Sequence, residues 1–134
     1  MISVNEYLNH WTLRYGTVHV PDDELTPAMM EAAANTVDKA NQLLERFGQS
    51  RGINSGWRPV EVNKLVPGAA LMSNHTRCLA VDIADPEGDL DEWCLENQPI
   101  LAEIGIFLEH PASTKGWTHV QTVPPRSGRR VFYP

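Results

Sequence analysis

A histidine and an aspartate lie seven residues apart in the stretch SNHTRCLAVD, which spans residues 73–82. His75 belongs to a polar segment, and Asp82 follows the apolar run that begins a strand-like segment. A pair of this kind can be two surface residues, a hydrogen-bonded pair or two ligands of one metal ion. The choice between these readings depends on which other ligands the fold brings to the pair.

Strand alternation indicates where Asp82 and a second histidine point. Asp82 shares a strand face with two alanines, while the β-branched Val81 and Ile83 face the opposite side, as in a strand that buries them. His119 lies on the same face as Trp117 in the run WTHVQ, so a rigid and partly apolar wall would hold it. A buried aspartate is costly unless it is paired or bound to a metal.

His75 would complete a set of three metal ligands. It ends the loop before the Asp82 strand and could turn back toward that carboxylate. Two neutral imidazoles and one carboxylate are a common catalytic zinc shell, with water at the fourth position. Judged by spacing alone, these histidines and the aspartate could also occur together by chance. His10 and His19 lie apart from other candidate ligands, and we expect them at the surface or the edge of the core.

The helices expected from the sequence precede and separate the candidate residues. The clearest one spans residues 26–47, with apolar residues at helical spacing, Thr26 as its cap, Pro27 in its first turn and Gly48 at its exit. A second helix is expected over residues 90–103, bent or divided at Pro99. A short helix is expected over residues 3–13.

Four short strands carry or flank the candidate site. We expect them at residues 53–57, 78–84, 106–109 and 117–122, separated by loops rich in Gly, Pro, Asn and Ser. N-terminal helices packed on a small antiparallel sheet make an α+β fold. The length of 134 residues suits a single domain over residues 1–134.

Composition excludes several classes of function. The net charge of −6 argues against tight binding to nucleic acid, and no apolar run approaches the roughly 20 residues of a membrane helix. The N-terminal residues do not resemble a signal peptide, so we expect synthesis in a cytoplasm. We also expect a monomer, with Cys78 and Cys94 buried and reduced.

Three separated motifs resemble those of the M15 family of zinc peptidases. They are SGWRP at residues 55–59, SNHTRCLAVD at residues 73–82 and WTH at residues 117–119. The resemblance covers about residues 53–122 and implies a hedgehog or D-Ala-D-Ala peptidase-like fold. The family includes D-Ala-D-Ala carboxypeptidases and the L-alanyl-D-glutamate endopeptidases of phage lysins.

The resemblance implies roles for individual residues. His75, Asp82 and His119 would be the three zinc ligands. Arg58 would contact the substrate carbonyl, where a fixed cation suits the negative charge that develops as water attacks. Ser73 would brace the loop of His75 or contact substrate, although a simple loop-capping serine is an alternative.

Two further residues are expected to contact substrate: His110 and Trp117.

The departures from the family pattern fall at three positions. Cys78 stands where a glycine is expected, and it keeps the turn if the backbone there does not need a positive φ. Gly116 and Gln121 stand where relatives carry acidic residues, so neither supplies a general base.

Our first candidate for the base is Glu109, at the end of a predicted strand, and His110 is the second. The alternative is that Glu109 is a solvated hairpin residue.

The sequence therefore predicts a zinc-dependent peptidase that cuts an amide bond in the peptide stem or cross-link of peptidoglycan. A phage or prophage endolysin would be made in the host cytoplasm and act in the periplasm or cell wall after release. The main alternative is a zinc-binding module without catalysis, such as a phage structural or cell-wall-binding protein. A third hypothesis is an assembly protein that binds no metal.

Overall fold

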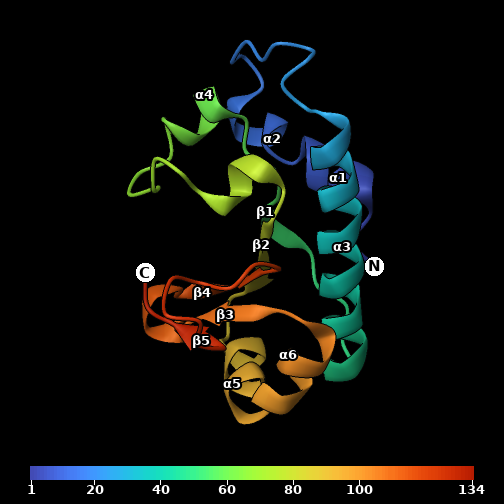
Figure 1. The fold of residues 1–134 in the computed structure, drawn as a ribbon, viewed down its shortest axis with the longest axis vertical. Coiled ribbons are helices and arrows are strands. Elements are labelled where there is room, and N and C mark those ends of the chain that lie inside the picture. Colours follow the sequence, from blue (N-terminus) through green and yellow to red (C-terminus); the bar gives the residue numbers. More distant parts are fainter.

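Five strands form one sheet in the order β1-β2-β4-β3-β5 (Figure 1). The computed structural model describes residues 1–134. The strands are β1 (Ile53–Ser55), β2 (Ala80–Asp85), β3 (Phe107–Glu109), β4 (Gly116–Gln121) and β5 (Val131–Phe132). Neighbouring strands are antiparallel except for β3 and β5, which are parallel. The α+β fold and four of the strands are confirmed, and β5 is an addition that the sequence pattern did not predict.

The helices follow the predicted order with one correction, and a short helix at residues 60–63 was not predicted. They are α1 (Val4–Asn9), α2 (Thr12–Tyr15), α3 (Pro27–Phe47), α4 (Val60–Asn63), α5 (Asp89–Glu96) and α6 (Gln98–Ile104). The single helix predicted over residues 3–13 is wrong, because the chain forms α1 and α2 instead. The Thr12 hydroxyl donates to the carbonyl of Asn9 at 2.7 Å and competes there with a continuous helical ladder. None of these helices is both long and apolar enough to cross a membrane.

The ends of the other helices lie where local chemistry places them. Thr26 accepts a hydrogen bond from the backbone of Met29 at 3.2 Å, and Gly48 ends α3 with a φ of 90°. The helix predicted over residues 90–103 is divided at Asn97, and Pro99 lies in the first turn of α6, where a missing N–H is tolerated.

The core forms where α3 packs along the sheet (Figure 1). Val81 and Ile83 of β2 are buried there, as alternation predicts, and α3 contributes Leu43 and Leu44. Tyr7 is fully buried, and its hydroxyl donates to the carbonyl of Ala80 at 2.6 Å. This hydrogen bond ties α1 to the strand that carries Asp82, so the N-terminal helices help to position that strand.

Cys78 occupies a strained backbone position just before β2. Its φ is 63°, and it is the one residue other than glycine with a positive φ. The turn is expected with Cys78 only if the backbone there does not need a positive φ, and the structure keeps the turn although that condition is not met. The side chain is completely buried, and Thr36 donates to the Cys78 carbonyl at 2.7 Å. Burial and this hydrogen bond offset the strain, which is about 1–3 kcal/mol for such a residue. Cys78 and Cys94 are both buried and free of disulfides, as predicted.

A buried carboxylate fixes the connection between β2 and α5. Asp85 accepts hydrogen bonds from the backbone N–H groups of Leu90 and Asp91 at 3.0 and 2.9 Å. These two groups lie in the first turn of α5, where they have no partner within the helix. Arg51 forms an ion pair with Asp85 at 3.1 Å. The strand that carries Asp82 is thus anchored at its far end as well.

Asp91 should make the stability of the fold depend on pH. Thr114 donates to its Oδ2 at 3.1 Å, while its buried Oδ1 has no partner. Burial raises the pKa of Asp91 from 3.8 to about 6. The folded state then binds this proton more readily than the unfolded state, so the free energy of unfolding falls as pH rises through that interval. The rise from 3.8 to about 6 corresponds to a loss of about 3 kcal/mol once the pH has passed the folded-state pKa.

An Asp91→Asn variant tests this expectation. In urea unfolding with chelator present, the variant should gain stability relative to the wild type between pH 4 and pH 7. Parallel stability curves for the two proteins over that range would contradict the assignment.

Candidate metal centre

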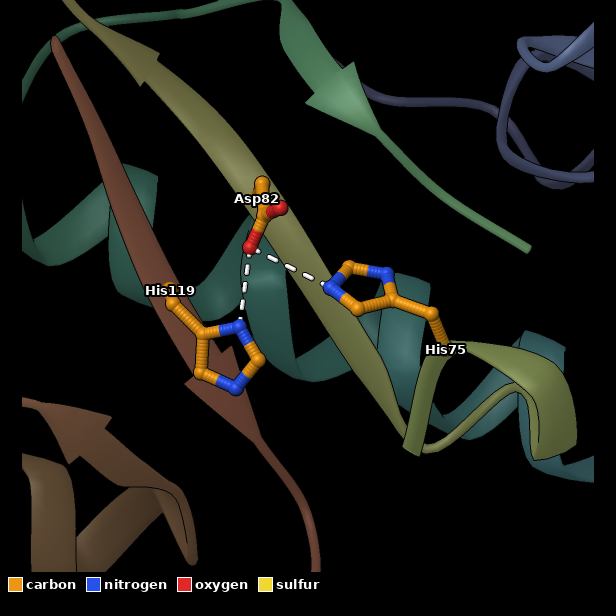
Figure 2. A group of neighbouring side chains, drawn as sticks. All are labelled: His75, Asp82 and His119. Atoms are coloured by element: carbon orange, nitrogen blue, oxygen red, sulfur yellow. Dashed lines mark hydrogen bonds and ion pairs between the residues drawn. The ribbon is translucent and has the colours of Figure 1, made fainter. Parts of the chain in front are cut away.

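Two imidazoles converge on one carboxylate oxygen at the middle of the sheet (Figure 2). Asp82 of β2 and His119 of β4 are directly paired across the antiparallel ladder. His75 reaches them from η1 (Asn74–Arg77), a 3₁₀ turn that leads into β2. Oδ1 of Asp82 lies 3.3 Å from Nε2 of His75 and 2.8 Å from Nδ1 of His119. The potential ligand atoms of the three residues all lie within 4.8 Å of one another, so they form a possible metal site.

The SGWRP segment holds His75 in place. The Gly56 carbonyl lies 2.8 Å from Nδ1 of His75, and the Arg58 backbone N–H donates to the His75 carbonyl at 3.1 Å. The Trp57 indole donates to the carbonyl of Thr76 at 3.3 Å. Because a carbonyl can only accept, the proton of a neutral His75 lies on Nδ1. Its Nε2, which faces Asp82, then carries a lone pair.

Gly56 has no room for a side chain, which gives a test of this clamp. A Cβ at Gly56 would lie 2.3 Å from the backbone oxygen of Tyr7. We expect Gly56→Ala to destabilise the fold by about 1–3 kcal/mol and to displace the carbonyl that orients His75. The matched control is Gly52→Ala, since a Cβ there meets nothing within 4 Å. Thermal unfolding should separate the two variants, and equal melting temperatures would contradict the packing argument.

His119 lies between two hydrogen-bond acceptors. Its Nδ1 faces Asp82, and its Nε2 lies 3.0 Å from Oε1 of Gln121. Burial would lower the pKa of His119, but its hydrogen bond to Asp82 and the charge of that carboxylate outweigh burial and raise the pKa. Burial would likewise raise the pKa of Asp82, but the neighbouring His75 and His119 hold it well below its ordinary value. The carboxylate is therefore ionised.

The arrangement of lone pairs fits a metal ion. His75 is 2% exposed, and burial lowers its pKa in spite of Asp82, so the ring is neutral. Its unprotonated Nε2 and the ionised Asp82 then face each other as two acceptors, which repel unless a cation lies between them. Two imidazole nitrogens and one carboxylate oxygen are a donor set that suits zinc.

Arg58 and Ser73 form a braced pair beside the cluster. Ser73 Oγ accepts from the backbone N–H of His75 at 3.2 Å and from Nη2 of Arg58 at 3.1 Å. The first of these bonds makes Ser73 the N-cap of η1, so the contact agrees with the loop-capping alternative as well as with a bracing role. Burial lowers the pKa of Arg58, with Asp82 opposing, and its Nε has no partner in the protein. A guanidinium with an ordinary pKa above 12 stays charged in this setting.

A cleft of about 1220 Å³ opens over the cluster. Its walls include Arg58, Ser73 and Trp117, together with residues of α2 and of the loop that follows α4. Glu109 also lines this cleft. Because β3 and β4 are paired from Phe107↔Gln121 to Leu108↔Val120, the same register places Glu109 beside His119. Burial raises the pKa of Glu109, with His119 opposing it.

His110 lies outside the residues that line the cleft. Its ring stacks on Tyr133 with centroids 4.5 Å apart, and its Nδ1 accepts from the backbone of Ala112 at 3.0 Å. His10, by contrast, lies on the cleft wall, while His19 is exposed. Neither belongs to the metal cluster, as expected.

Sequence reasoning missed Gln121 as a partner of His119, and it could not explain why Gly116 lacks an acid. Alternation places Gln121 on the face of His119, which was a usable signal. Gly116 has a φ of 100°, so an acidic side chain there would adopt a strained backbone.

Comparison with known proteins identifies a family for this chain. A family model described as Peptidase M15 matches residues 2–121, a span that includes His75, Asp82 and His119. The matched region ends with β4 and leaves β5 outside. No curated protein and no solved structure matches the chain.

Proposed function

The chain belongs to the M15 peptidase family, a family of metallopeptidases, and we propose that it is a zinc-dependent peptidase acting on the peptide stem or cross-link of peptidoglycan. The observation that carries the proposal is the His75–Asp82–His119 cluster at the base of a large cleft. Family membership supports a peptide-containing substrate.

Zinc would be held by Nε2 of His75, Oδ1 of Asp82 and Nδ1 of His119. Their unprotonated nitrogens and ionised oxygen are the donors that a zinc site needs. When bound, zinc acts as a Lewis acid that polarises a carbonyl and lowers the pKa of water toward about 7.

Glu109 is the proposed general base. Its carboxylate lines the cleft beside His119. It takes a proton from the attacking water and delivers it to the leaving amine nitrogen as the amide C–N bond breaks. A raised pKa suits this double role, since the group must both gain and lose a proton.

Arg58 is the proposed oxyanion partner. Ser73 fixes its guanidinium on one side, which leaves other N–H donors for the substrate. These donors would stabilise the negative charge that grows on the carbonyl oxygen. Ser73 and Trp117 line the same cleft, and we propose that they contact the substrate.

The cell-wall substrate is supported by family membership and by two arginines of the cleft, which also contains the carboxylates of Asp82 and Glu109. Peptidoglycan stems carry free carboxylates, and Arg14 and Arg58 line the cleft wall. We propose an endolysin role on the same basis, since phage lysins are among the members of this family.

Digestion of purified peptidoglycan tests the proposal. The zinc-loaded protein should release new amino groups, and mass spectrometry of the products would identify the bond that is cut. Activity should disappear in chelator and return with zinc. A protein that binds zinc but releases no product from peptidoglycan or from synthetic stem peptides would instead be a zinc-binding module without catalysis.

A further inference from the structure

Gln121 is a buried side chain whose orientation the structure fixes. It is 4% exposed, and its amide nitrogen Nε2 donates to the carbonyl of Val123 at 2.9 Å. Because a carbonyl oxygen only accepts, the amide nitrogen must face Val123 and the amide oxygen must face His119. Oε1 of Gln121 accordingly lies 3.0 Å from Nε2 of His119.

We propose that Gln121 is a positioning residue that keeps the proton of His119 on Nε2 and so presents an unprotonated Nδ1 to the metal ion. This inference rests on the proposed zinc site. A neutral imidazole carries one proton, and an amide oxygen on Nε2 retains it there. Nδ1, which lies 2.8 Å from Oδ1 of Asp82 and can donate to it in the metal-free protein, is then the nitrogen that gives up its proton when the ion binds.

Both histidines of the cluster have an oxygen acceptor against the ring nitrogen that points away from Asp82. The Gly56 carbonyl holds the proton of His75 on Nδ1, and the Gln121 amide holds that of His119 on Nε2. With a metal ion bound, the nitrogen of each ring that faces Asp82 would be the unprotonated one. A backbone carbonyl cannot be replaced by mutation, but Gln121 can, so it offers the direct test.

Two substitutions separate the contact with His119 from the contact with Val123. Gln121→Glu keeps an oxygen acceptor beside His119 and loses the donor to Val123. Gln121→Leu removes both the acceptor beside His119 and the donor to Val123, with a side chain of similar size. The matched control is Gln42→Leu, because Gln42 is an exposed glutamine on α3, remote in sequence from the cluster.

The measurement is the zinc affinity of each metal-free protein, by competition with a chromophoric chelator. Gln121→Leu should weaken zinc binding by about 10–100-fold, the usual effect of removing an outer partner of a ligand histidine. Gln121→Glu and Gln42→Leu should bind zinc at least as tightly as the wild type. Urea unfolding in chelator shows that each variant is folded before its affinity is compared.

Either of two results would overturn the positioning role. Wild-type affinity in Gln121→Leu would show that the contact with His119 is unnecessary. Equal losses in Gln121→Leu and Gln121→Glu would show that Gln121 acts through Val123. A wild-type protein that binds no zinc would overturn the proposed function together with this inference, so the two failures are distinguishable.

Discussion

Asp82→Asn should abolish zinc-dependent activity and weaken zinc binding by far more than the roughly 10–100-fold loss expected from an outer partner. The carboxylate is the one negative charge among the three ligands, and both imidazoles face its Oδ1 at 3.3 and 2.8 Å. The amide has similar size but no charge, so two neutral nitrogens would remain without an anionic ligand. Zinc affinity is measured by chelator competition on metal-free protein.

Thermal unfolding gives an independent readout of the same change. A ligand that binds only the folded state adds about 2.7 kcal/mol when it is present at 100 times its Kd. Zinc should therefore raise the Tm of the wild type and leave that of Asp82→Asn nearly unchanged. Asp22→Asn, on an exposed loop, is the control and should behave like the wild type. An equal shift in Asp82→Asn would show that zinc binds elsewhere.

Glu109→Gln should reduce turnover by about 10²–10⁴-fold, the usual contribution of a general base, while zinc content stays unchanged. Glutamine fills the same space on the cleft wall but cannot take up the proton of the attacking water. Because Glu109 is absent from the metal cluster, its loss should not weaken zinc binding. Release of new amino groups from peptidoglycan measures turnover, and elemental analysis measures zinc.

The control for Glu109 is Glu103→Gln, which removes an exposed carboxylate from α6. It should retain full activity. Full activity in Glu109→Gln would rule out this base and leave the reaction without an assigned proton acceptor on the cleft wall. Loss of zinc together with activity would instead indicate a structural role for Glu109.

The sequence predicted features whose causes are local. Thr26 predicted the cap of α3, Pro27 its first turn and Gly48 its exit, and the structure confirms all three. Alternation along β2 and β4 predicted which residues share a face with Asp82 and with His119, because successive side chains of a strand point to opposite sides. The pairing of Asp82 with His119 then places both on one face of the sheet.

Long-range causes explain what the sequence could not predict. Gly56 is required by the backbone of Tyr7, a contact between residues far apart in the chain. The two-residue strand β5 depends on pairing with β3, and no local pattern marks it. The positive φ of Cys78, by contrast, has a local cause, since Cys78 is the C-cap of η1, and the glycine that relatives carry at this position was a signal for it.

The candidate site likewise combines features with local causes and features that depend on distant residues. The three cluster residues could be selected by type and spacing together with the resemblance to a family pattern, whereas the direction of each ring depends on Gly56 and Gln121 as partners. Glu109 could be proposed only on the condition that its strand pairs with β4, and that pairing is present.

Metal content is the most direct test of the central claim. Elemental analysis should be performed on protein purified without an affinity tag, alongside the His75→Ala variant. A zinc centre built on His75 should give about one zinc ion per chain in the wild type and almost none in the variant. A wild-type protein that contains no zinc, even after zinc is supplied, would contradict the metal centre and the peptidase function built on it.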